Sequence, residues 1–150
     1  MNRTFAFTGA QKIVFGNKSF HGLAGHIQTL NAKNPLVVLD KNLAKAGLGE
    51  VVANLLVPEG IKYTVFDKVE PEPRIELADE GAAVAVKNKC DIVVGIGGGS
   101  AMDTAKAIAV LATNKGGAVD YLGLNKVAKP GLPKIMVPTT AGTGSEVTFT

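Results

Sequence analysis

Short apolar runs and longer stripes of apolar residues alternate along most of this chain. Runs rich in β-branched residues begin near residues 36, 61, 91 and 135, and each predicts a buried strand. Helices are predicted over residues 74–88 and 100–113 and around the apolar stripe of Leu48, Val51, Val52, Leu55 and Leu56. This alternation predicts the α/β class: a parallel, Rossmann-like sheet with helices on both faces.

The two ends of the chain predict further strands. Residues 5–7 and 12–15 are strand-like pieces separated by Thr8 and Gly9, and together they predict an N-terminal edge hairpin. Residues 147–150 also have strand character. A weak helix is expected over residues 19–30.

Four polar or glycine-rich segments come directly after predicted strands. They are Asp40, the loop at residues 70–73, residues 97–100 and residues 139–145. Because the carboxyl ends of parallel strands meet at one edge of a sheet, we expect these segments to lie close together. Ligands of such sheets bind beyond that edge, so the sequence predicts a binding site there.

Gly97, Gly98, Gly99 and Ser100 stand at the start of a predicted helix, and we call these four residues the glycine turn. Bare backbone at the positive end of a helix suits an anion, which predicts a phosphate or pyrophosphate site. The run is neither a G-x-G-x-x-G fingerprint nor a P-loop, and a tight turn that needs small residues for packing is the alternative. Asp103 follows Ser100 at capping-box spacing, and its carboxylate is also expected in the ligand cleft.

Asp40 ends a predicted strand beside this cleft. A carboxylate there accepts hydrogen bonds from the hydroxyl groups of an adenosine ribose and repels a 2′-phosphate, which predicts NAD over NADP. The neighbouring charge of Lys41 weakens that electrostatic preference. The alternative role of Asp40 is a solvated carboxylate or the N-cap of the next helix.

A hydroxyl-rich stretch follows the last strong strand. Its four hydroxyl groups belong to Thr139, Thr140, Thr143 and Ser145. Hydroxyl and backbone N–H groups can hold phosphate and ribose without a charge, although a hydroxyl-rich turn that binds no ligand is the alternative. Taken with Asp40 and the glycine turn, this stretch predicts a dinucleotide site.

The composition of the chain argues against several classes of function. With 150 residues, 46% of them hydrophobic, the chain is predicted to form one domain with a sizeable core. The net charge is +3, and no basic stripe with interleaved aromatic residues argues for nucleic acid. A single cysteine, Cys90, fits a reducing cytoplasm, and no apolar run is long enough for a membrane span. We therefore expect a cytoplasmic protein that binds neither nucleic acid nor membrane.

Groups for catalysis are few. The two histidines, His21 and His26, are five positions apart, so they do not share a helix face, and no cluster of acids or cysteines accompanies them. No G-x-S-x-G nucleophile elbow occurs. The residues alone therefore predict a chain that binds a dinucleotide but carries no catalytic residue and no metal site.

Residues 97–106 and 138–148 resemble the two N-terminal signatures of the iron-containing (group III) alcohol dehydrogenases. That family includes lactaldehyde/propanediol oxidoreductases and butanol dehydrogenases. Residues 15–16 and 37–40 are similar to its opening segments as well. The resemblance implies interconversion of a small alcohol with an aldehyde or ketone, with NAD or NADP as hydride carrier and Fe²⁺ or Zn²⁺ polarising the substrate oxygen.

The resemblance also implies roles for individual residues. The glycine turn would hold the pyrophosphate, Asp40 the adenosine ribose, and the loop at residues 70–73 would flank the adenine. Asp103 would lie near the nicotinamide. The rest of the cofactor cleft would be lined by Thr139, Thr140, Thr143 and Ser145.

Members of this family run to nearly 400 residues and share a dehydroquinate-synthase-like superfold. Their helical C-terminal domain supplies the metal ligands, one Asp and three His, and this chain contains none of those positions. We therefore expect residues 1–150 to be the NAD(P)-binding domain alone, which pairs with the missing domain or forms a homo-oligomer. The alternatives are a non-catalytic NAD-binding fragment, a split subunit, or an enzyme like dehydroquinate synthase or glycerol dehydrogenase, although the signature at residues 139–146 favours the alcohol dehydrogenases.

Overall fold

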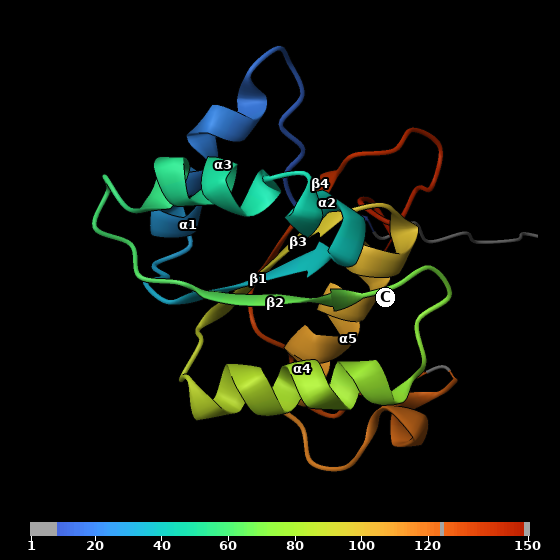
Figure 1. Ribbon diagram of the computed structural model, residues 1–150. Coiled ribbons are helices and arrows are strands. Elements are labelled where there is room, and N and C mark those ends of the chain that lie inside the picture. Colours follow the sequence, from blue (N-terminus) through green and yellow to red (C-terminus); the bar gives the residue numbers. More distant parts are fainter. Residues whose placement is uncertain (1–8, 124, 149–150) are drawn as a thin grey trace, which may run out of the picture.

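The computed structural model describes residues 9–123 and 125–148, which form a parallel four-stranded sheet with helices on both faces (Figure 1). The strand order is β2-β1-β3-β4, and every neighbouring pair is parallel. The strands are β1 (Pro35–Asp40), β2 (Thr64–Val69), β3 (Ile92–Gly97) and β4 (Lys134–Pro138). The α/β class and the parallel sheet predicted from the sequence are confirmed.

The helices form two layers, one above and one below the sheet in Figure 1. The upper layer holds α1 (Leu23–Thr29) and α3 (Leu48–Leu56), and the lower layer holds α4 (Glu76–Lys87) and α5 (Gly99–Leu111). Short helical segments complete the list: η1 (Ser19–Gly22), α2 (Lys41–Lys45) and η2 (Ala118–Tyr121). None of the helices in the described part of the chain is long and apolar enough to span a bilayer.

The two central strands are apolar on both faces because each face supports a separate core. In β1, Val37 and Leu39 pack toward α1 and α3, whereas Leu36 and Val38 pack toward α4 and α5. All six residues of β3 are buried as well. Burial of these side chains on both faces explains why the strands read as continuous apolar runs rather than alternating ones.

The helix α5 lies unusually close to β3. A Cβ atom added to Gly95 would come within 2.6 Å of the Cβ of Ala105 and 3.0 Å of the Sδ of Met136. Only a glycine in the strand lets the helix backbone approach this far. The close approach sets the distance of α5, and therefore of the start of the glycine-turn helix, from the sheet.

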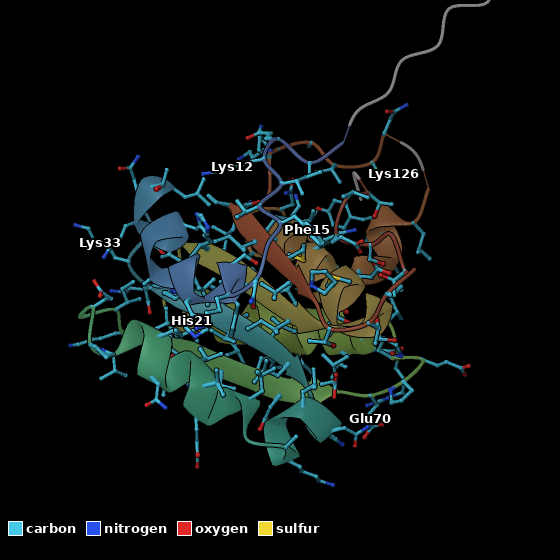
Figure 2. All side chains as sticks on the ribbon, turned by 90° about the horizontal axis from the view of Figure 1, so that it is seen from above. Lys12, Phe15, His21, Lys33, Glu70 and Lys126 are labelled. Carbon is cyan, nitrogen blue, oxygen red and sulfur yellow. The ribbon has the colours of Figure 1, made fainter. Side chains whose placement is uncertain are left out.

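The N-terminal edge hairpin is not formed as predicted. Residues 12–15 have no strand structure, and residues 5–7 lie outside the described residues. Ile13, Val14 and Phe15 are 67, 49 and 100% exposed, and Figure 2 shows Lys12 and Phe15 on this extended segment. An apolar run becomes a strand only where a neighbouring strand accepts its backbone hydrogen bonds, and the described sheet pairs none with these residues.

Two other strand predictions need correction. The second strand was expected from Ile61 but begins at Thr64, because pairing with β1 starts there and Ile61 instead packs into the core below α3. Val147 and Thr148 form a turn instead of a strand, since both of their amides donate to the carbonyl oxygen of Gly144. Residues 149–150 of that predicted strand lie outside the described residues.

Cys90 is buried two residues before β3 begins, with 8% of its surface exposed. Burial raises the pKa of its thiol. Because the thiolate is the reactive form, this environment favours a structural role for the residue.

Candidate cofactor site

The site lies where the direction of strand connections reverses. From β1 the chain crosses to β2 on one side, and from β3 it crosses to β4 on the other side. The carboxyl ends of the neighbouring strands β1 and β3 therefore open a crevice that no crossover helix covers, which is where α/β sheets bind ligands. Asp40 and Gly97 are the last residues of these two strands.

The glycine turn links β3 directly to α5. Gly97 has a φ of 154°, and a Cβ atom there would come within 2.6 Å of the Cβ of Ala101, so only glycine fits. The N-cap of α5 is Gly98, which has no side chain to satisfy the amides of the first helical turn. Those amides have no acceptor within the helix and carry the positive end of its dipole, which suits an anion.

The predicted capping box at Ser100 and Asp103 is absent. The helix α5 begins at Gly99, so Ser100 lies inside the first turn and cannot be the N-cap. The carboxylate of Asp103 is used elsewhere, as an acceptor for the hydroxyl of Ser145 in the loop that follows β4. The capping prediction failed because the triplet of glycines let the helix start earlier than the side-chain pattern suggested.

Asp40 serves as the N-cap of α2, one of the alternatives open at the sequence level. Its Oδ1 accepts hydrogen bonds from the amides of Asn42 and Leu43, both at 2.9 Å. The other oxygen, Oδ2, lies only 3.2 Å from where a Cβ of Gly97 would be. One carboxylate oxygen thus organises the local helix while the other faces the glycine turn.

The loop after β4, residues 139–148, forms the opposite wall, and we call it the hydroxyl loop. It is anchored by a hydrogen bond of 2.9 Å from the amide of Thr139 to the carbonyl oxygen of Gly97. The Oγ1 of Thr140 lies 3.3 Å from a Cβ position at Gly98, and the Oγ of Ser145 lies 3.3 Å from one at Gly99. The hydroxyl groups therefore line a bare backbone cradle that any larger side chain would fill.

Behind this wall, hydrogen bonds join the hydroxyl loop to α5. The Oγ of Ser145 donates to the Oδ2 of Asp103 at 3.2 Å, and the Nζ of Lys106 donates to the Oδ1 of Asp103 at 3.3 Å. Lys106 is 3% exposed, whereas the side chain of Asp103 is 61% exposed. The carboxylate therefore faces the opening and the ammonium lies in the interior.

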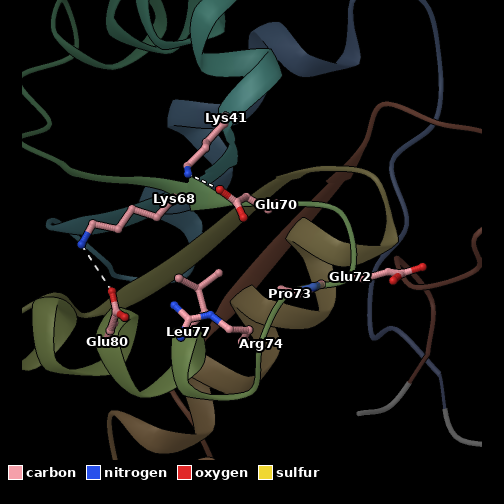
Figure 3. A pocket seen from close by; sticks show the side chains of 8 residues that line it. All are labelled: Lys41, Lys68, Glu70, Glu72, Pro73, Arg74, Leu77 and Glu80. Carbon is pink, nitrogen blue, oxygen red and sulfur yellow. Dashed lines mark hydrogen bonds and ion pairs between the residues drawn. The ribbon is translucent and has the colours of Figure 1, made fainter.

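Next to Asp40, a pocket opens between the end of β2 and the start of α4 (Figure 3). Lys41 forms an ion pair with Glu70, and the hydrogen bond and charge of Lys41 lower the pKa of that carboxyl. Lys68 pairs with Glu80 at 3.3 Å, as the dashed lines in Figure 3 show. The pocket is lined by Lys41, Lys68, Glu70, Glu72, Pro73, Arg74, Leu77 and Glu80.

The structure brings all the predicted site residues to one edge of the sheet. In addition it shows contacts of Lys106 and Thr148 and an ion pair between Lys41 and Glu70, none of which the sequence predicts. The available signal for Lys106 was a single lysine in a helix whose other residues, apart from Ser100, Asp103 and Thr104, are glycine or apolar. The pair of Lys41 with Glu70 joins residues 29 positions apart, and no local pattern indicates it.

No group of three or more His, Cys, Asp or Glu side chains that could hold a metal ion occurs within residues 9–123 and 125–148. His21 belongs to η1 and His26 to α1, both on the layer above the sheet and away from the glycine turn. The described residues therefore fit a dinucleotide and do not by themselves fit a metal ion.

A doubly wound parallel sheet with an anion cradle at its switch point defines a nucleotide-binding α/β domain. A family model described as iron-containing alcohol dehydrogenase matches residues 10–150. The chain belongs to the iron-containing alcohol dehydrogenase family.

Individual relatives agree with this assignment. Long-chain-alcohol dehydrogenase 1 of Geobacillus thermodenitrificans is 46% identical over 129 residues, which cover 84% of this chain and 33% of that protein. A crystal structure of 1,3-propanediol oxidoreductase superposes with a TM-score of 0.91 and 37% identity, covering 97% of this chain and 38% of that one. Sulfoacetaldehyde reductase from Bifidobacterium kashiwanohense, solved in complex with NAD+, gives a TM-score of 0.88 and 32% identity, covering 98% of this chain and 39% of that one. The chain spans about a third of the length of these relatives.

Proposed function

We propose that residues 1–150 are the NAD-binding domain of a metal-dependent alcohol dehydrogenase, which interconverts a small alcohol with an aldehyde or ketone. The observation that carries the proposal is the cradle at the switch point: the start of α5, which Gly98 cannot cap with a side chain, flanked by Asp40 and the hydroxyl loop. The family match and the structural relative solved with NAD+ support it. They also favour a dehydrogenase over a lyase of the dehydroquinate-synthase type.

Different residues of the cradle would bind different parts of the dinucleotide. The glycine turn, including Ser100, would hold the pyrophosphate through backbone amides, and Thr139, Thr140, Thr143 and Ser145 would hold the adjoining ribose and phosphate oxygens. Asp103 faces the same opening and would lie near the nicotinamide. When bound, the nicotinamide ring supplies hydride transfer, while this chain orients the cofactor through the contacts above.

NAD is favoured over NADP by the charges near Asp40. Its Oδ2 is not used in capping α2 and would accept hydrogen bonds from the ribose hydroxyl groups while repelling a 2′-phosphate. Lys41 could attract that phosphate, but its ammonium is paired with Glu70. The pocket lined by residues 70–74 would then take the adenine.

The proposed function also includes a metal, a substrate pocket and a partner. Fe²⁺ or Zn²⁺ would be bound by residues of a helical domain outside residues 1–150, and that domain would supply most of the alcohol pocket. We also propose that the chain assembles into a homo-oligomer.

Titration of NADH and NADPH by fluorescence tests the cofactor proposal. We expect the unmodified chain to bind NADH, and Asp40→Asn to weaken NADH by about tenfold, which corresponds to the loss of one charge-assisted hydrogen bond. The same variant should strengthen NADPH by about tenfold, because the carboxylate no longer repels the 2′-phosphate. Asparagine also caps helices, so this variant removes the charge while keeping α2 intact. Asp40→Gly removes both the charge and the cap.

A companion variant tests whether the ion pair shields NADPH. In Glu70→Gln, the ammonium of Lys41 loses the negative charge of its partner, and NADPH binding is expected to strengthen with little change for NADH. Equal affinity of the unmodified chain for both cofactors would contradict the selectivity proposal. An absence of binding to either cofactor would contradict the proposed function itself.

A further inference from the structure

One buried residue of α5, Lys106, carries a charge. Of the helix's thirteen residues, the buried ones are otherwise apolar or small, yet Lys106 is 3% exposed. Burial of an ammonium group carries a large desolvation cost unless hydrogen bonds and an opposite charge compensate it. Its partners therefore indicate what the residue does.

Those partners close a ring between the helix and the hydroxyl loop. The Nζ of Lys106 donates to the Oδ1 of Asp103 at 3.3 Å and to the Oγ1 of Thr148 at 2.6 Å. The Thr148 hydroxyl donates in turn to the carbonyl oxygen of Ser145 at 3.3 Å. The ring is completed by the Oγ of Ser145, which donates to the Oδ2 of Asp103 at 3.2 Å.

The hydroxyl loop depends on such attachments because it contains neither helix nor strand. Gly142 and Gly144 have φ angles of 94° and 70°, and their Cβ positions have no neighbour within 4 Å, so this part of the loop packs against little. At one end the loop is held by the bond from Thr139 to Gly97. At the other end it is held by the ring that Lys106 closes.

We propose that Lys106 is a positioning residue: it fixes the hydroxyl loop against α5 so that Ser145 and Asp103 face the glycine turn before the cofactor arrives. This inference rests on the proposed function, because the loop that Lys106 holds is the wall of the proposed NAD cradle. A preformed wall does not have to be ordered at the moment of binding, and the affinity for the cofactor rises accordingly. Lys106 itself touches no cofactor atom in this scheme.

The test compares Lys106→Met with the conservative Lys106→Arg and with Lys87→Met, a control that removes an exposed lysine from α4. NADH affinity is measured by fluorescence, and hydrogen–deuterium exchange is measured across residues 139–148. We expect Lys106→Met to weaken NADH binding by about tenfold and to accelerate exchange in the hydroxyl loop selectively. Lys106→Arg should restore part of both, and Lys87→Met should change neither.

A second variant covers the case in which Lys106→Met does not fold. Thr148→Val changes an exposed residue, removes one hydroxyl from the ring and leaves the pair of Lys106 with Asp103 in place, and it should show the same two effects more weakly. Normal NADH affinity and unchanged loop exchange in a folded Lys106→Met or Thr148→Val chain would overturn the inference. Failure of the unmodified chain to bind NADH would instead overturn the proposed function, while exchange in the loop would still report whether Lys106 holds it.

Discussion

Gly98→Val is expected to abolish NADH binding, raising its Kd by at least about a hundredfold, while the chain remains folded. Gly98 has φ −80° and ψ −171°, an extended conformation that valine adopts readily. Its first side-chain atom would lie 3.3 Å from the Oγ1 of Thr140, in the gap where the pyrophosphate would meet the helix amides. The side chain would therefore occupy the anion site without disturbing the core.

Fluorescence titration measures the NADH affinity of Gly98→Val, and thermal unfolding shows whether the variant remains folded. Gly49→Val is the matched control, because it makes the same substitution in α3, where a Cβ atom meets nothing within 4 Å. If a folded Gly98→Val chain bound NADH as tightly as the unmodified one, the pyrophosphate could not pass over the start of α5.

Gly95→Ala is expected to lower the free energy of unfolding by about 2–3 kcal/mol, at the upper end of the cost of overpacking. The added Cβ would lie 2.6 Å from the Cβ of Ala105 and 3.4 Å from the Cα of Met102, and neither atom can move without moving α5. Because α5 carries the glycine turn, the displacement should weaken NADH binding as well. Urea unfolding followed by circular dichroism measures the loss of stability.

A double-mutant cycle tests whether the contact between the added Cβ and Ala105 causes this loss of stability. Ala105→Gly removes the atom that the new Cβ meets, at a cost of about 1 kcal/mol in helix propensity. The double variant Gly95→Ala/Ala105→Gly should then be destabilised by less than the sum of the two single variants. If the losses of stability in the two single variants simply added in the double variant, the contact between residues 95 and 105 would not be the cause of the destabilisation.

Local patterns of apolar and polar residues were sufficient to predict much of the architecture. The continuous apolar runs in β1 and β3 could only be strands buried on both faces, and the stripe around Val52 and Leu56 marked α3 as amphipathic. The order of strands and loops was sufficient to place Asp40, the glycine turn and the hydroxyl loop at one edge. Parallel strands leave no other arrangement for their carboxyl ends.

The errors occurred where a segment needed a partner distant in the sequence. Residues 12–15 have the composition of a strand but lack a neighbouring strand in the described sheet. The start of β2 was displaced to Thr64 by its register with β1. Asp103 matched a capping box locally, but its carboxylate bonds instead to Ser145, 42 residues away.

The sequence by itself determined the α/β fold, the parallel sheet and the chemistry gathered at its edge, because buried strands and bare glycines are local features of composition and spacing. Only the tertiary structure decided how those groups are held. It divided the carboxylate of Asp40 between a helix cap and the glycine turn, paired Lys41 with Glu70, and buried Lys106 in a ring with the hydroxyl loop. Such contacts depend on the distance between segments after folding, and neither composition nor spacing along the chain encodes that distance.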